Sequence, residues 1–121
     1  MSTLNPTSYV RQMDPKAEPV KELTGSADAI DISIGNIFVL NRSGAVNSAT
    51  LAAPAAADEG RVIWVVNGTT QANTITITAG LGGSGGSYDT LTFTNVVAAN
   101  VSLRAYNEAW YLVGQYGITV S

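Results

Sequence analysis

Cysteine and histidine are both absent from the 121-residue chain, and their absence removes whole classes of chemistry. Without cysteine there are no disulfides, thiol nucleophiles or thiolate metal ligands. Without histidine the chain lacks the most common general base and a common transition-metal ligand. The lack of cysteine also fits synthesis in a reducing cytosol. We therefore expect no enzyme activity and no cofactor.

Charged side chains are scarce as well. They make up 12% of the chain, against 45% for hydrophobic residues, whereas an ordinary soluble domain carries roughly 25% charged residues. The net charge of −3 offers no basic surface for nucleic acid. No apolar run approaches the roughly 18 residues that a membrane-spanning helix needs. We expect a folded protein with less free surface than usual, and neither nucleic acid nor a membrane as its partner.

The N-terminal region differs from the rest of the chain. Residues 1–28 hold three of the four prolines and show no sustained apolar periodicity. Because proline fixes φ and favours extended backbone before it, we predict an extended arm over 1–28. Residues 29–121 then form a single body of ordinary domain size. We find no internal repeat along the chain.

Short strands separated by turns fill the predicted body. Apolar and polar residues alternate in several segments, which is typical of half-buried strands. The segment 55–60 is too short for a stable helix but allows one helical turn. The predicted strands are 30–34, 37–40, 49–51, 61–67, 74–78, 90–94, 101–106, 110–113 and 118–120. This spacing predicts an all-β fold, either an antiparallel β-sandwich, a jelly roll or a small barrel.

Three of these strands are apolar on both faces. In the segment 61–67, Val62, Trp64 and Val66 point one way while Ile63 and Val65 point the other. In an isolated two-sheet domain, one face of each strand meets water and should be polar. The outer faces therefore need a cover, which is either the chain's own arm and loops or a neighbouring subunit.

Low charge favours a neighbouring subunit, because interface cores are depleted in charge and enriched in aromatic residues. We predict self-association through the large apolar side chains of the strands that do not alternate. These residues are Phe38, Trp64, Val65, Trp110 and Tyr111.

Other patterns could indicate a ligand site. Gly80–Gly85 matches G-x-G-x-x-G, but the chain continues into another strand instead of the helix that a dinucleotide loop requires. We interpret it as a flexible loop between strands. Trp64, Tyr106, Trp110 and Tyr111 form either a sugar-stacking platform or anchors of a core or interface, and the second reading is favoured.

The acidic residues show no pattern typical of catalysis or metal binding. Asp89 and Glu108 could form a carboxylate pair for glycoside chemistry, but the sequence shows no cleft between them. The other acidic residues lack the spacing of a calcium loop. We therefore predict no catalytic residue and no metal site. The acidic residues considered for calcium are Asp28, Asp31, Asp58 and Glu59.

Four segments together resemble a β-module that is common in virion proteins of tailed bacteriophages. The segments are 60–68 (GRVIWVVNG), 74–77 (TITI), 91–93 (LTF) and 101–114 (VSLRAYNEAWYLVG). The shared pattern is a strand ending in Asn, a T-I-T-I strand and a closing N-x-x-W-Y hairpin, and it covers roughly residues 35–114. Glu108 and Ala109 stand where the closing turn of this module often carries glycine.

The resemblance implies a structural role. The module occurs in capsid decoration (cement) proteins and in tail-fibre or spike domains, and one module with an arm is similar to the decoration proteins. The resemblance implies a homotrimer on the capsid surface of the virion, bound to the major capsid protein. The arm residues expected to contact the capsid are Leu4, Tyr9, Val10, Met13 and Val20.

The alternative is a tail-fibre, spike or baseplate module that binds a host receptor or glycan. It would use exposed aromatic side chains and the loop 79–87.

Overall fold

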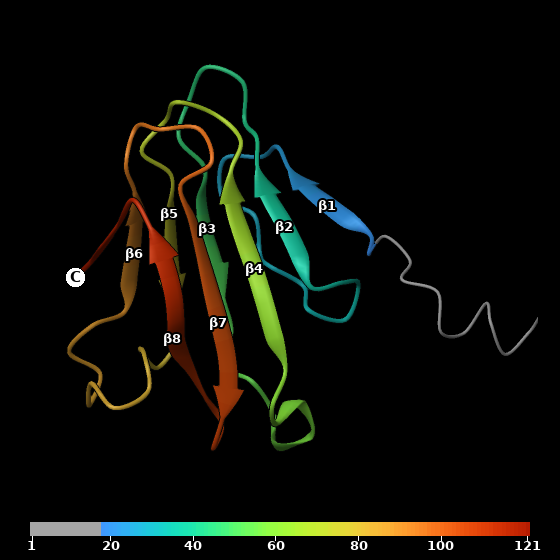
Figure 1. Ribbon diagram of the computed structural model, residues 1–121, viewed down its shortest axis with the longest axis vertical. Helices are drawn as coiled ribbons and strands as arrows, with labels where there is room; N and C mark the ends of the chain where they lie inside the picture. The colour runs from blue at the N-terminus through green and yellow to red at the C-terminus, as the bar shows by residue number, and fades with distance from the viewer. Residues whose placement is uncertain (1–17) are drawn as a thin grey trace, which may run out of the picture.

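The structure is a computed structural model that describes residues 18–121, and it is all-β with two mixed sheets (Figure 1). The five-stranded sheet has the order β1-β2-β4-β7-β8, and the four-stranded sheet has the order β3-β5-β6-β9. One 3₁₀ turn, Ala56–Asp58, lies where the sequence allowed a helical turn. The strands are β1 (Val20–Leu23), β2 (Ile37–Leu40), β3 (Ser48–Leu51), β4 (Val62–Asn67), β5 (Thr74–Ile77), β6 (Thr90–Phe93), β7 (Asn100–Tyr106), β8 (Ala109–Tyr116) and β9 (Ile118–Val120).

The first half of the body winds as a coil between the two sheets. In the five-stranded sheet, β1 pairs with β2 and β2 with β4, and both pairs are parallel. In the other sheet, Ala29 bridges to Thr50 of β3, and β3 pairs with β5, again in parallel. The prediction of a purely antiparallel fold is therefore wrong. Each turn of the coil leaves one sheet, crosses to the other and returns beside the previous turn, and such a return makes parallel neighbours.

The second half closes the sheets with antiparallel strands. β6 pairs with β5, β7 with β4, β8 with β7, and β9 with β6. The β7–β8 hairpin turns at Asn107 and Glu108, whose φ angles are 52° and 58°. Two-residue hairpin turns of this kind need positive φ at both central positions. This turn joins the segments 101–106 and 110–113, which the sequence predicted as strands.

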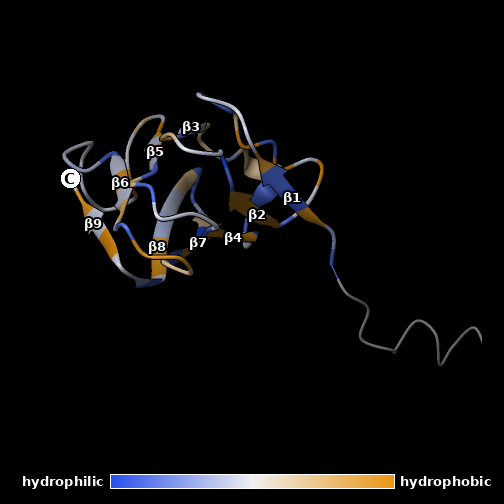
Figure 2. Cartoon of the chain, turned by 90° about the horizontal axis from the view of Figure 1, so that it is seen from above, coloured by the Kyte–Doolittle hydropathy of each residue, from blue (hydrophilic) through white to orange (hydrophobic). Residues whose placement is uncertain are grey.

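Side chains from both sheets meet in one hydrophobic core. Figure 2 shows the chain from above, with β3 and β5 on one side and β4, β7 and β8 on the other. Successive side chains of a strand point to opposite faces, so every second residue reaches the core. Trp110 is fully buried there, and its Nε1 donates a hydrogen bond to the Ala52 carbonyl oxygen at 2.9 Å. The apolar strand residues that are at most 1% exposed are Phe38, Leu40, Ala49, Leu51, Ile63, Val65, Ile75, Ile77, Leu91, Phe93, Val101, Leu103, Ala105 and Trp110.

The predicted boundary between arm and body needs correction. Residues 20–23 form β1, a strand of the five-stranded sheet, and Leu23 is buried in the core. The Leu23 carbonyl oxygen also accepts hydrogen bonds from Asn47 Nδ2 and Asn41 N. The body therefore includes residues that the sequence assigned to an arm ending at residue 28.

The segment 30–34 is a turn and not the predicted strand. The Asp31 carboxylate accepts hydrogen bonds from the backbone N–H and the hydroxyl of Ser33, at 2.9 and 2.6 Å. The Ile34 N–H also donates to the Asp31 carbonyl oxygen. An Asp side chain that bonds the backbone two residues later competes with strand pairing. The apolar alternation in this segment was misleading for that reason.

Candidate functional site

The face of the five-stranded sheet that points away from the core carries large apolar side chains, and we call it the outer face. Trp64 is 51% exposed on it and Val62 is 39% exposed, whereas Ile63 and Val65 on the inner face are 0% exposed. Ile37, Val39 and Val66 on this face are partly buried. Strand β4 is apolar on both faces: its inner face is buried in the core, and its outer face is not covered by residues 18–121.

Strand register places Trp64 at the centre of the outer face. Val20 of β1 lies opposite Ile37 of β2, and Ile37 lies opposite Trp64. On its other side Trp64 lies opposite Ser102 of β7. Directly opposed residues share a face and contact each other, so an apolar row crosses the sheet from its β1 edge to its centre.

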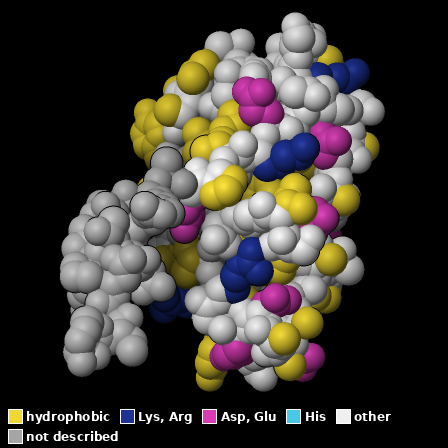
Figure 3. Space-filling view, turned by 90° about the vertical axis from the view of Figure 1, so that its right-hand side faces the viewer, with side chains coloured by type: hydrophobic (Ala, Val, Ile, Leu, Met, Phe, Trp, Pro, Cys, Tyr) yellow, Lys and Arg dark blue, Asp and Glu magenta, His cyan; other side chains and the backbone are white. Residues whose placement is uncertain are grey.

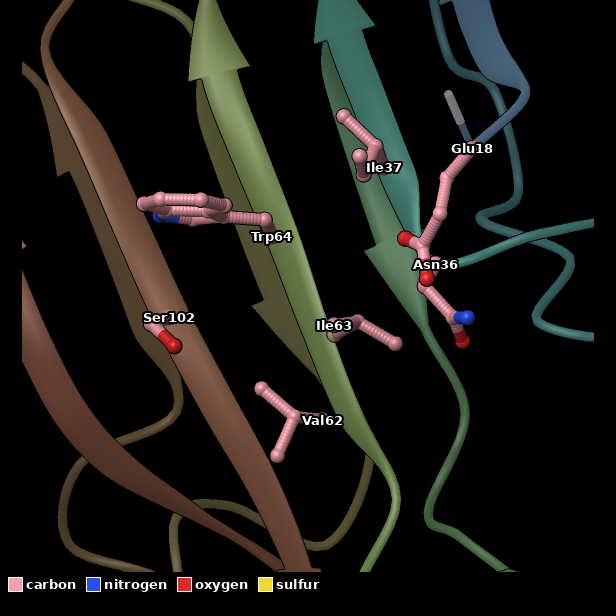
Figure 4. A pocket seen from close by; sticks show the side chains of 7 residues that line it. All are labelled: Glu18, Asn36, Ile37, Val62, Ile63, Trp64 and Ser102. Atoms are coloured by element: carbon pink, nitrogen blue, oxygen red, sulfur yellow. The ribbon is translucent and has the colours of Figure 1, made fainter. Parts of the chain in front are cut away.

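A pocket of about 370 Å³ lies beside the indole of Trp64 (Figure 4). The indole extends toward Ser102 on one side, and the side chains of Glu18 and Asn36 lie at the end nearest β1. Asn36 is held in place because its Oδ1 accepts a hydrogen bond from Arg61 Nε at 2.6 Å. The lining residues are Glu18, Asn36, Ile37, Val62, Ile63, Trp64 and Ser102.

The β1 edge of the five-stranded sheet is protected against pairing with another strand. Lys21 and Glu22 of β1 are exposed, and Pro19 precedes the strand. Charged side chains and proline at a sheet edge discourage edge-to-edge pairing. Figure 3 shows acidic and basic side chains interspersed with apolar ones on this side of the molecule. We therefore take the outer face, and not this edge, as the candidate contact surface.

A second pocket, of about 320 Å³, lies between the glycine-rich loop and β8. The ring of Tyr111 packs directly on Gly82, since a Cβ at Gly82 would clash with ring carbons. Tyr106 meets Tyr111 edge to face, with ring centroids 5.6 Å apart. The loop continues into β6, as expected, and not into a helix. The lining residues are Leu81, Gly82, Gly83, Ser84, Tyr88, Tyr111 and Leu112.

Burial divides the residues that the sequence assigned to self-association. Phe38, Val65 and Trp110 are 0% exposed and pack in the core of a single copy, so a second copy cannot reach them. Trp64 lies exposed on the outer face, and Tyr111 lies half-buried. Of the five residues predicted for self-association, only Trp64 and Tyr111 therefore remain accessible to a second copy. Trp110 is also removed from the candidate sugar-stacking platform. The sequence could not decide which face of a two-sided apolar strand turns inward.

The residues predicted to contact a capsid are mostly beyond the described part of the chain. Leu4, Tyr9, Val10 and Met13 lie outside residues 18–121. Val20 lies in β1 and is 55% exposed. It therefore belongs to the edge of the outer face and not to a separate arm.

The acidic residues hold turns together. Asp28 Oδ2 accepts hydrogen bonds from Gly25 N and Asn47 Nδ2, and Glu59 Oε1 accepts one from Asn107 N. Asp58 accepts a hydrogen bond from Ala55 N. The hydrogen bonds from Ser33, first the hydroxyl and then the backbone N–H, lower the pKa of Asp31 below its usual 3.8.

Asp89 Oδ1 accepts a hydrogen bond from the neighbouring Thr90 hydroxyl, and Glu108 sits in the hairpin turn. Within residues 18–121, no group of three or more acidic side chains is arranged to hold a metal ion.

Sequence reasoning missed a line of buried polar side chains at one corner of the coil. Asn47, Asn67 and Asn73 are all 0% exposed. Asp28, Asn47 and Asn73 stand directly before Ala29, β3 and β5, so each marks the entry to the four-stranded sheet. The sequence did contain a pattern that could have indicated these positions: an Asp or Asn that follows a small or apolar residue and directly precedes a strand. We call Asp28, Asn47, Asn73 and Asn67 the polar ladder.

No known family model matches the chain, and no curated protein is significantly similar to it in sequence. In the part of the chain that the structure describes, no helix has the length and apolar character to cross a membrane.

Proposed function

We propose that this protein is a capsid decoration (cement) protein of a tailed-bacteriophage virion, without enzyme activity. It forms a homotrimer and binds the outside of the shell made by the major capsid protein. The resemblance of residues 35–114 to a virion β-module supports this role. The observation that carries the proposal is the exposed outer face, where Trp64 stays 51% exposed although the body has a complete core of its own.

In this proposal the two sheets act as a rigid β-sandwich and the outer face mediates contact between copies. Exposed apolar patches that are larger than scattered single side chains typically mark protein interaction surfaces. Aromatic anchors such as Trp64 contribute most to such contacts. The residues expected from the sequence to contact the capsid are Leu4, Tyr9, Val10 and Met13, together with Val20 of β1. Binding to the assembled shell alone stabilises it by mass action, and many copies act together through avidity.

The first experiment tests self-association. The mass of the full-length protein is measured by light scattering over a range of concentrations, for the wild type and for Trp64→Gln. We expect a trimer that Trp64→Gln dissociates. Val97→Gln is the matched control, because Val97 is 54% exposed but lies in the loop between β6 and β7. A wild type that remains monomeric at high concentration would refute the proposal.

The second experiment tests binding to the shell. Protein lacking residues 1–17 is mixed with shells of the major capsid protein, and bound copies are counted after sedimentation. The deletion stops before β1, so it leaves both sheets intact. We expect the shortened protein to stay folded and trimeric but no longer to bind the shell. Unchanged binding would contradict the role of the N-terminal residues.

The tyrosine-lined pocket favours one other function, a tail-fibre, spike or baseplate module that binds a host receptor or glycan. The ring of Tyr111 is held by Gly82 and Tyr106, and Tyr88 is exposed at the same pocket. Fixed aromatic rings suit stacking on sugars. A glycan array with the wild type and Tyr88→Gln tests this function, with Trp64→Gln as the control. Sugar binding that only Tyr88→Gln abolishes would favour it over decoration.

A further inference from the structure

Charge is divided across the outer face. Glu18 and Glu22 lie at its β1 side, next to exposed apolar Val20. Arg104 of β7 lies opposite Val62 and is exposed, while its neighbours Leu103 and Ala105 point into the core. Arg104 therefore shares the outer face with Trp64, but it lies on β7, beyond the Trp64 end of the apolar row, whereas the glutamates lie at the Val20 end.

The pocket beside Trp64 suits a flat cation. The indole offers an aromatic face to which a guanidinium binds by cation–π attraction. Glu18 supplies a carboxylate at the other end of the pocket, and carboxylates pair with guanidinium through two parallel hydrogen bonds. A purely apolar occupant would cover Glu18 without a partner, which is costly for a charged group.

The chain itself carries a suitable side chain. Arg61 is engaged, because it donates to Asn36, Ile32 and Gly35, and Arg42 Nη1 donates to the Val46 carbonyl oxygen. Lys21 pairs in register with buried Phe38 and so lies on the opposite face of β1. The Arg104 guanidinium makes no hydrogen bond or ion pair with any residue from 18 to 121.

We propose that the pocket beside Trp64 receives the Arg104 guanidinium of a second copy of this chain, which pairs there with Glu18. This inference rests on the proposed self-association and names its contact. Because Glu18 lies toward the β1 end of the apolar row and Arg104 lies on β7 beyond its other end, contact between the β1 side of one copy and the β7 side of another brings one charge onto the other. In a trimer the contact is head to tail, so each copy offers its pocket to one neighbour and its Arg104 to the other.

Charge reversal tests the pairing. The full-length variants Glu18→Arg, Arg104→Glu and the double variant are compared with the wild type by light scattering over a range of concentrations. Each single reversal puts like charges in contact, so we expect the dissociation constant to rise at least about tenfold. The double variant restores the pair with its polarity exchanged, and we expect it to recover most of the wild-type affinity.

Lys21→Glu is the matched control, because it also reverses one exposed charge but on the opposite face of β1. Circular dichroism confirms that every variant is folded. Single reversals that leave the mass unchanged would overturn the pairing while self-association stands, and so would a double variant that fails to recover. A monomeric wild type would overturn the proposed function itself.

Discussion

The polar ladder is the part of the interior where one side chain connects several turns of the coil. Asn73 Oδ1 accepts a hydrogen bond from the Asn47 backbone N–H at 2.7 Å. Its Nδ2 donates to Asn67 Oδ1 at 2.5 Å and to the Thr69 hydroxyl at 3.3 Å. Asn67 Nδ2 in turn donates to three backbone carbonyl oxygens. Asn73 thus joins the entry to β3, the end of β4 and the start of β5.

We predict that Asn73→Ala destabilises the protein by about 2–5 kcal/mol. The substitution leaves the Asn47 N–H and Asn67 Oδ1 without their partner at a site where all three asparagines are 0% exposed. Each buried polar group that loses its only partner costs about 1–3 kcal/mol, and the two costs overlap because they belong to one network. The free energy of unfolding of a typical domain is about 5–15 kcal/mol, so the predicted loss is a large fraction of the total stability.

Urea denaturation followed by circular dichroism measures this loss. We expect the midpoint to fall with little change in the m-value, because the folded state keeps its compactness. Asn41→Ala is the control, since Asn41 Nδ2 makes an exposed hydrogen bond to Glu22 and its loss should cost less than about 0.5 kcal/mol. A cost below about 1 kcal/mol for Asn73→Ala would show that water or neighbouring groups replace its hydrogen bonds, and would refute the reasoning.

Two further predictions concern turns. Glu108 has a φ of 58°, which penalises residues with a Cβ, so Glu108→Gly should raise the free energy of unfolding by about 0.5–1 kcal/mol in urea denaturation. Asn107→Gly should gain less because asparagine tolerates this conformation, and a loss of stability in Glu108→Gly would contradict the argument. Ser33→Ala removes the main cause of the lowered pKa of Asp31, so the pKa should rise in an NMR titration. The lowered pKa adds stability above the unfolded value of 3.8, and that contribution is lost as the pH falls through the lower, folded value; an unchanged pKa in Ser33→Ala would contradict this assignment.

Strand positions were largely predictable because they follow from local pattern. The clean alternation of Thr and Ile in 74–78 corresponds to β5, and the segment 61–67 contains β4. The predicted strands 101–106 and 110–113 lie within β7 and β8, which pair as a hairpin. The segment 30–34 failed because a single hydrogen-bonding Asp side chain outweighed the apolar alternation. β1 was missed because Val20–Leu23 has a charged centre, and only Leu23 is buried.

The sequence indicated that an apolar strand surface would need a cover, but it did not indicate which residues form the exposed face. The excess of apolar strand surface in β4 was visible in the sequence, and it corresponds to an exposed outer face around Trp64. Which aromatic residues belong to that face was not visible, and Phe38 and Trp110 proved to be core residues. The pocket joins Glu18 to Ser102, residues more than eighty positions apart. No local pattern connects them.

The sequence by itself determined the β class, most strand positions and the excess of apolar surface, because these depend on residues a few positions apart. Only the tertiary structure decided that the first strands wind in parallel as a coil, since successive turns differ in length and leave no fixed period to detect. It also decided which face of β4 is buried, because that depends on where the second sheet packs. The polar ladder depends on the same stacking, which brings Asp28, Asn47 and Asn73 together at one corner.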